Sequence, residues 1–179
     1  MLVLAIMAVV LTLALPAMGG LLQAARLRST RDALLDSLSM ARMEAVRRNS
    51  RVVLCKSADG VDCSTTGDWS QGWIIFNDRN NNLRRDTDEP LMTQERGLPR
   101  TVRITGNQPI ANYVSYGARG TARLQSGAFQ SGTFTICSTT QTRQQAFAIP
   151  IRPSGRARPV NTTLETCAPA TPAAPGASD

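Results

Sequence analysis

The sequence of 179 residues contains no histidine and only one lysine, Lys56. Histidine is the commonest general base in enzymes, a member of most catalytic triads and a frequent zinc ligand. Its absence argues against the usual hydrolytic and zinc-dependent mechanisms, so we expect a protein that is not an enzyme and that carries no cofactor. The length suits one compact folded domain rather than two.

Acidic residues are missing from a long stretch of the C-terminal half. Residues 96–164 contain no Asp or Glu but nine arginines. Residues 1–95 hold eleven basic and eleven acidic side chains, so the whole net charge of +7 arises in the second half. Arginine presents a planar fork of donors that suits phosphate. The imbalance indicates that an anion outside the chain supplies the missing negative charge.

The N-terminal segment is strongly apolar. Residues 1–22 contain no charged side chain, and as a helix they would extend about 33 Å, enough to span a bilayer. A signal peptide cleaved after residue 19 is an alternative interpretation. Apolar residues then recur at spacings of three, four and seven, as an amphipathic helix requires. They are Ala24, Leu27, Leu34, Leu38, Ala41 and Ala45.

We therefore predict one helix of nearly fifty residues, with residues 1–22 as its transmembrane half and residues 23–50 as its amphipathic half. Residues 51–167 are expected to form a β-rich head, and residues 168–179, rich in Pro and Ala, a disordered tail. The predicted strands are Arg51–Lys56, Gly72–Asn77, Leu91–Glu95, Thr101–Thr105, Asn112–Tyr116, Thr121–Leu124, Gly132–Ser138, Gln145–Ile151 and Ala157–Thr162.

Alternating apolar residues predict how these strands are buried. Val102 and Ile104, like Phe134 and Ile136, alternate with polar residues, which is typical of half-buried antiparallel strands. The fold class is therefore α+β, a long N-terminal helix packed on antiparallel β-sheet. Four large side chains are expected in the core that faces the helix. They are Trp69, Trp73, Ile74 and Phe76.

Four cysteines allow three pairings. Proximity favours Cys55–Cys63, which would close a seven-residue turn, and Cys137–Cys167, which would close a longer loop. By loop entropy these bridges would stabilise the fold by roughly 2–3 and 3–4 kcal/mol. Disulfides persist in oxidising compartments. Four reduced thiols in a cytosolic protein remain the alternative.

The segment SGRARPV, residues 154–160, lies inside that longer loop. Gly155 permits a backbone conformation that other residues resist, and Arg156 and Arg158 would project from one face of an extended segment. Two guanidinium forks without a nearby acid suit the phosphates of a nucleic acid backbone. Arg152 and Arg143 are candidates to extend the patch. A solvated hairpin whose arginines keep an edge soluble is the alternative.

Two further patterns suggest ligands. Five oxygen-bearing residues in DRNNNLRRDTDE match the spacing of an EF-hand calcium loop, although Leu83 stands where that loop needs glycine. They are Asp78, Asn80, Asn82, Asp86 and Glu89. Asx side chains also stabilise ordinary loops, so the expected metal content is none. An exposed Tyr113 or Tyr116 would add stacking on single-stranded nucleic acid.

The order of several blocks resembles the FimT/GspH family of type IV minor pilins and pseudopilins. The blocks are MLVLAIMAVVLTLALP, NSRVVLCKSADGVDC, GDWSQGWIIFNDRNNN, DEPL, GTFTIC and SGRAR. The resemblance implies a type IV pilin-like fold, insertion in the inner membrane with a periplasmic head, and assembly with other pilins into a type IV pilus at the cell surface. Members carry a basic leader ending in glycine, an N-methylated residue and a glutamate; because residues 1–31 contain no acid, we expect these features upstream of Met1.

Within the family, SGRAR resembles the Gly-Arg-x-Arg motif of FimT-like pilins that bind DNA during natural transformation. That resemblance implies non-sequence-specific DNA binding through Gly155, Arg156 and Arg158, and a role in competence. The alternative is a minor pilin or type II secretion pseudopilin that primes filament assembly without binding DNA.

Overall fold

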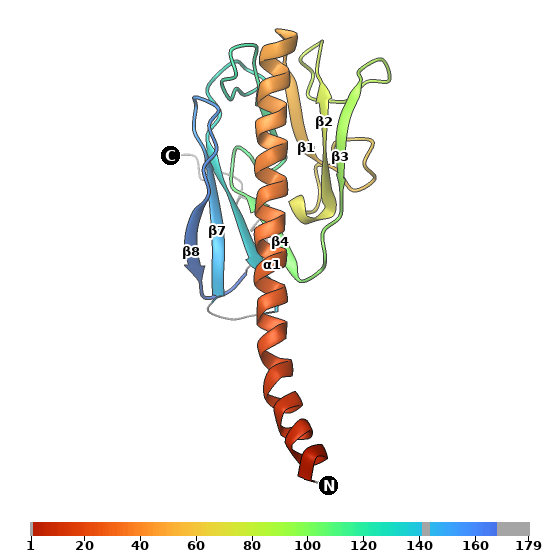
Figure 1. The fold of residues 1–179 in the computed structure, drawn as a ribbon. Helices are drawn as coiled ribbons and strands as arrows, with labels where there is room; N and C mark the ends of the chain where they lie inside the picture. Colours follow the sequence, from red (N-terminus) through yellow and green to blue (C-terminus); the bar gives the residue numbers. More distant parts are fainter. Residues whose placement is uncertain (1, 141–143, 168–179) are drawn as a thin grey trace.

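The computed structural model describes residues 2–140 and 144–167, with side chains for residues 19–140 and 145–167. Within these ranges, a single long helix, α1 (Leu2–Arg48), is followed by eight strands (Figure 1). The strands are β1 (Val52–Lys56), β2 (Gly72–Asn77), β3 (Leu91–Arg96), β4 (Val102–Gly106), β5 (Tyr113–Tyr116), β6 (Gly132–Ser138), β7 (Gln144–Ile151) and β8 (Val160–Leu164). The prediction of one long helix and antiparallel sheet is confirmed.

The strands form two antiparallel sheets on either side of α1 (Figure 1). The first sheet has the order β3-β2-β1-β5 and the second has the order β4-β6-β7-β8. Only the C-terminal half of α1 lies against the sheets, and its N-terminal half extends beyond them (Figure 1). The helix ends where Asn49 adopts a positive φ of 49°, and the amide of Ser50 donates to the carbonyl of Ala45 (3.2 Å).

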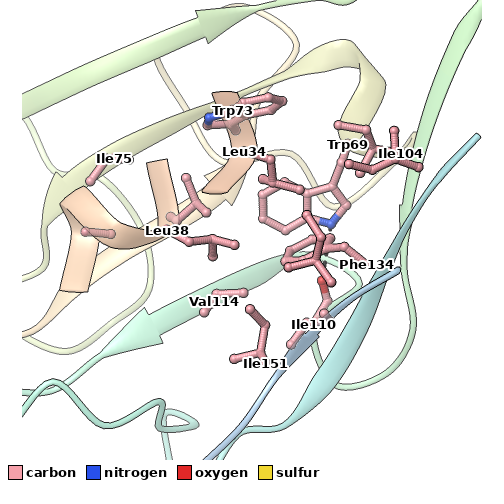
Figure 2. Close-up of a cluster of buried hydrophobic side chains, with 14 of the residues drawn as sticks. Leu34, Leu38, Trp69, Trp73, Ile75, Ile104, Ile110, Val114, Phe134 and Ile151 are labelled. Carbon is pink, nitrogen blue, oxygen red and sulfur yellow. Dashed lines mark hydrogen bonds between the residues drawn. The ribbon is translucent and has the colours of Figure 1, made fainter. Parts of the chain in front are cut away.

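The main core lies between α1 and both sheets (Figure 2). Leu34 and Leu38 from the helix are completely buried there, and each such side chain contributes roughly 2 kcal/mol. Trp69 packs edge-on against Phe134, with ring centroids 4.9 Å apart, and its indole N–H donates to the carbonyl of Ile110 (3.2 Å). The Trp73 indole donates to the hydroxyl of Ser37 (2.9 Å), which ties the first sheet to the helix.

The apolar stripe of α1 follows the predicted spacing. Five of its residues are buried: Leu27, Leu34, Leu38, Ala41 and Ala45. Ala24 is only half-buried, whereas the polar residues Gln23 and Thr30 are buried. The Gln23 amide donates to the carbonyl of Thr101 (2.9 Å) and to the hydroxyl of Ser138 (3.0 Å), which satisfies its polar group inside the interface.

Two of the predicted strands need correction. Residues 121–124 form only isolated bridges, Tyr116 to Ala122 and Arg123 to Phe129. The last strand begins at Val160 rather than Ala157, because residues 152–156 make a tight turn and Ala157 pairs with Ile151 by a single bridge. Turn geometry at these points overrides the local preference for extended backbone.

The placement of Ile74 and Phe76 was also wrong. Trp69 and Trp73 lie in the core that faces the helix, but Ile74 and Phe76 pack with Val53 on the opposite face of the first sheet. Successive side chains of a strand point to opposite faces, so β2 cannot send Trp73 and Ile74 to the same side. Both faces of this strand are buried, which explains its continuous apolar run.

The expected membrane-spanning segment, residues 1–22, falls mostly on residues whose side chains are not described. In the part of the chain that the structure describes, no helix has a stretch long and apolar enough to cross a membrane. Residues 168–179, the expected tail, lie outside the described residues.

Candidate nucleic-acid interface

The motif around Gly155 forms a tight turn between β7 and β8, at the end of the second sheet that lies beside the last turns of α1 (Figure 1). The amide of Gly155 donates to the carbonyl of Arg152 (2.8 Å), and the amide of Arg152 donates to the carbonyl of Arg156 (3.1 Å). The backbone polar groups therefore bond within the turn, and no side chain of the turn is needed to close it.

Gly155 is required here for two reasons. Its φ is +77°, a conformation that residues with a Cβ rarely adopt. A Cβ at this position would also lie only 2.0 Å from the carbonyl oxygen of Gly120. The expectation that Gly155 permits an unusual turn is confirmed, and its close contact with Gly120 is an additional restraint that the sequence did not reveal.

Helix α1 packs against the contact between Gly120 and Gly155. Gly120 has a φ of +69°, and a Cβ there would approach Val46 to 3.1 Å. The Nε of Arg42 donates to the carbonyl oxygen of Gly120 (2.9 Å), and the amide of Ala122 donates to the carbonyl of Pro153 (3.2 Å). Arg42 is half-buried, and its hydrogen bond ties α1 to the contact between Gly120 and Gly155.

The arginines of the turn remain in solvent. Arg152, Arg156 and Arg158 are all exposed. In the described ranges, their guanidinium groups make no ion pair with an acidic side chain. Gly155 itself is buried, so a fixed backbone carries exposed charges. Arg143, the other proposed member of the patch, lies outside the described residues.

A shallow groove of about 310 Å³ separates this segment from α1. Residues 155–158 line one side, so Arg156 and Arg158 both border it. The helix lines the other side with Leu38, Ser39, Arg42 and Met43. Among the residues that the structure describes, no acidic side chain is part of this lining. The groove is therefore open to an anion on its arginine-bearing side.

Two other arginines of the acid-free stretch, Arg103 and Arg123, are engaged away from the turn. Arg103 pairs with Asp68 (3.3 Å), an acid from the first half of the chain. Arg123 lies over the ring of Phe129 at 4.1 Å and donates to the carbonyl of Gly127 (2.8 Å). Arg119, next to Gly120, is exposed. Charge counting alone could not separate these arginines from those of the turn.

The two tyrosines do not provide an exposed stacking surface. Tyr116 is completely buried, and burial raises the pKa of its hydroxyl above the usual range. Tyr113 is half-buried beside the second apolar cluster. Phe129, at 58% exposure, is the large exposed aromatic residue among those described.

In the loop that resembles an EF-hand, side-chain oxygens accept hydrogen bonds from the loop itself. Both carboxylate oxygens of the buried Asp78 accept backbone amides, from Asn82 (3.0 Å) and Leu83 (3.1 Å). Asp86 accepts the side-chain amides of Asn80 (2.7 Å) and Asn82 (2.8 Å).

Glu89 completes the same network by accepting the amides of Arg79 (2.6 Å) and Asp86 (3.2 Å). Leu83, in the position of the EF-hand glycine, has a φ of +62°. Across the described residues, no three His, Cys, Asp or Glu side chains are grouped so as to hold a metal ion. The side-chain oxygens of this segment are bonded within the loop itself, as in a loop stabilised by Asx side chains.

Both disulfides are present. Cys55 bonds to Cys63 with 5.6 Å between their Cα atoms, and Cys137 bonds to Cys167 with 5.7 Å. These are the pairs that proximity favoured. The second bond joins β6 to the residues after β8, so the turn at Gly155 belongs to a covalently closed loop.

Comparisons with known proteins give the family. A family model described as type II transport protein GspH matches residues 30–155. The type IV minor pilin FimU of Pseudomonas aeruginosa is similar in one crystal form, with 19% identity, a TM-score of 0.62, and coverage of 81% of this chain and 97% of FimU. A second crystal form of FimU gives 19% identity, a TM-score of 0.59, and coverage of 79% and 100%.

The minor pseudopilin EpsH from the type 2 secretion system of Vibrio cholerae is similar at 11% identity with a TM-score of 0.52, and 75% of this chain and 96% of EpsH are covered. A search of curated proteins finds no match. The matched family range ends at Gly155, so Arg156 and Arg158 lie beyond it. The chain belongs to the GspH family, and its fold is the type IV pilin-like fold of minor pilins and pseudopilins.

Proposed function

We propose that this chain is a minor pilin that binds DNA without sequence preference through the arginines around Gly155, and that it supports DNA uptake in natural transformation. The observation that carries the proposal is a turn held by backbone hydrogen bonds, whose Arg156 and Arg158 are exposed and border a groove without an acidic residue in its described lining. Arg152 is exposed on the same turn, and Arg143 follows β6 in the sequence. No catalytic step is part of this role.

The chemistry favours a polyanion over a single small anion. Guanidinium forks bind phosphate oxygens in pairs, and a row of them follows a phosphate backbone. The turn that carries Arg156 and Arg158 is not itself helical, so contacts of a recognition helix with base edges are not expected. Binding should therefore depend strongly on salt and weakly on sequence.

The remaining assignments complete this proposal. Residues 1–22 would anchor the chain in the inner membrane and form the filament core, residues 23–50 would carry the head, and residues 51–167 would be periplasmic, with residues 168–179 as a tail. Two disulfides suit an oxidising periplasm. After assembly with other pilins, the head would lie on a type IV pilus at the cell surface. N-terminal methylation would accompany the processing of the helix.

The test is DNA binding by the full chain in a zwitterionic detergent, measured by fluorescence anisotropy with a labelled 30-base-pair duplex. If three to five phosphates are neutralised, the slope of log affinity against log salt should be about −3 to −4.5. Arg156→Gln combined with Arg158→Gln should weaken binding roughly 100-fold at low salt, since each lost charged contact costs about tenfold.

The matched control is Arg26→Gln combined with Arg28→Gln, which removes two exposed arginines from the distal part of α1. This control should retain nearly all of the affinity. Binding that is absent in the wild type, or equal in the two double variants, would exclude the proposal.

A role in assembly without DNA binding is the second candidate, favoured by the match to the GspH model. Exposed apolar side chains on α1 are available for contact with other subunits, namely Leu21, Leu22, Met43 and Val46. In cells that lack the gene, both double variants should restore filaments if assembly is independent of the turn. Failure of the Arg156→Gln and Arg158→Gln variant to restore filaments would favour the assembly role.

A further inference from the structure

Helix α1 contributes an arginine to the groove beside the Gly155 turn, and this arginine is not part of the Gly-Arg-x-Arg motif. Its α1 side contains Arg42, whose guanidinium is half-buried between the helix and the glycine contact. Arg42 is separated from Arg156 by more than a hundred residues of sequence, so only the fold brings the two to one groove.

Of the three guanidinium nitrogens of Arg42, only Nε is hydrogen-bonded to a described residue. Its Nε donates to the carbonyl of Gly120 (2.9 Å), and in the described part of the chain this is its only hydrogen bond. The two terminal nitrogens, which carry four further N–H donors, make none. A planar group fixed through Nε keeps its outer edge in a defined direction, which is the arrangement that suits bidentate binding of an oxyanion.

In the described ranges, no acidic side chain forms an ion pair with Arg42. Glu44, two residues further along α1, accepts hydrogen bonds from Arg47 and Arg48 instead. The hydrogen bonds from Arg47, followed by that from Arg48, lower the pKa of Glu44 to about 2. The exposed hydroxyl of Ser39 is the other polar group on the helix side of the groove.

We propose that this groove is a phosphate-binding site in which Arg42 acts together with Arg156 and Arg158. The inference rests on the proposed DNA function and adds a residue of α1 to the interface. A backbone phosphate seated between helix and turn would meet guanidinium groups from both sides. Arg42 would also position the turn, because the carbonyl that it holds is the one against which Gly155 packs.

The experiment measures binding of the same labelled duplex to full-length Arg42→Gln in detergent. We expect a roughly tenfold loss of affinity and a salt slope that is less negative by about 0.9, the value for one phosphate contact. The control is Arg28→Gln, which changes an exposed arginine of α1 outside the groove lining and should leave both quantities unchanged.

A second variant tests the groove without touching the Gly120 contact. Ser39→Glu places a carboxylate at an exposed position of the lining, and repulsion should lower duplex affinity roughly tenfold or more. Ser29→Glu makes the same change at an exposed position ten residues earlier on α1 and should have little effect. This pair remains informative if Arg42→Gln does not fold.

The outcomes separate the two proposals. If Arg156→Gln with Arg158→Gln weakens binding while Arg42→Gln and Ser39→Glu do not, the phosphate site is wrong and DNA binding stands. If Arg42→Gln lowers affinity and Tm but leaves the salt slope unchanged, Arg42 only positions the turn and the proposed contact is wrong. If the wild type does not bind the duplex, the function itself fails.

Discussion

The loop at residues 78–89 and the turn at residues 152–158 both look like ligand sites in the sequence, and they differ in how their side chains are used. In the first, Asp78, Asp86 and Glu89 accept hydrogen bonds from the loop itself. In the second, backbone bonds and a glycine contact hold the turn, and the arginines remain exposed. Side chains that build a loop are not available to a ligand, whereas side chains carried on a fixed backbone are.

The largest effect is expected from Gly155→Ala, which disturbs the backbone that holds the turn and leaves its arginines in place. Positive φ and the overlap with the Gly120 carbonyl should together lower the free energy of unfolding by about 3 kcal/mol. The turn should also move, so that DNA affinity falls although every arginine is retained. Thermal unfolding and duplex binding measure the two effects.

The control is Gly127→Ala, because Gly127 has a φ of +87° but no atom within 4 Å of the added Cβ. It should cost only the backbone strain, about 1–2 kcal/mol, and should leave DNA binding intact. Equal losses in the two variants would mean that the Gly120 contact does not matter.

The complementary test in the first loop is Asp78→Ala. Two backbone amides lose a charged acceptor in a buried position, and unfolding free energy should fall by about 2–3 kcal/mol in urea denaturation. DNA binding should not change. Asp88→Ala, at an exposed position of the same loop, should change stability by less than about 0.5 kcal/mol.

The effect of Ca²⁺ on thermal unfolding tests the opposite interpretation, that this loop binds a metal ion. Because its carboxylates are engaged with amides, added Ca²⁺ or a chelator should leave the Tm of the wild type unchanged. A rise in Tm with Ca²⁺ that Asp78→Ala abolishes would show that these carboxylates do serve a ligand, and the contrast between the loop and the turn would disappear.

The smallest effect concerns the charge balance beside the proposed groove. Hydrogen bonds from Arg47 and Arg48 lower the pKa of Glu44 from 4.5 to about 2 in the folded chain. Its contribution is therefore fully present above about pH 4.5 and is lost as the pH falls through about 2. Glu44→Gln should lower unfolding free energy by about 0.5 kcal/mol at pH 7.

The stability difference between the wild type and Glu44→Gln should shrink as the pH approaches 2, and paired denaturation curves across pH 2–7 measure it. A difference that stays constant over this range would contradict a role for the Glu44 charge. If Glu44 instead neutralised the charge of Arg42, Glu44→Gln would also strengthen DNA binding. Binding of the duplex to Glu44→Gln should therefore be measured as well.

Local patterns predicted much of the fold. The spacing of Leu27, Leu34 and Leu38 identified the buried stripe of α1, and the alternation of Val102 and Ile104 matches burial along β4. These signals are local, because each depends on the 3.6-residue or two-residue period of one element. The assignment of Ile74 and Phe76 failed because a strand buried on both faces has no alternation from which to choose a side.

The sequence by itself determined the long helix, the antiparallel strands, a glycine at position 155 that permits an unusual turn and the run of arginines without acids, since each depends on backbone preference or composition. The tertiary structure alone decided that Arg42 holds Gly120 against Gly155 and that Arg103 is paired while Arg156 is exposed. The physical reason is distance along the chain: contacts between segments separated by tens of residues depend on how helix and sheets pack, and no local period encodes them.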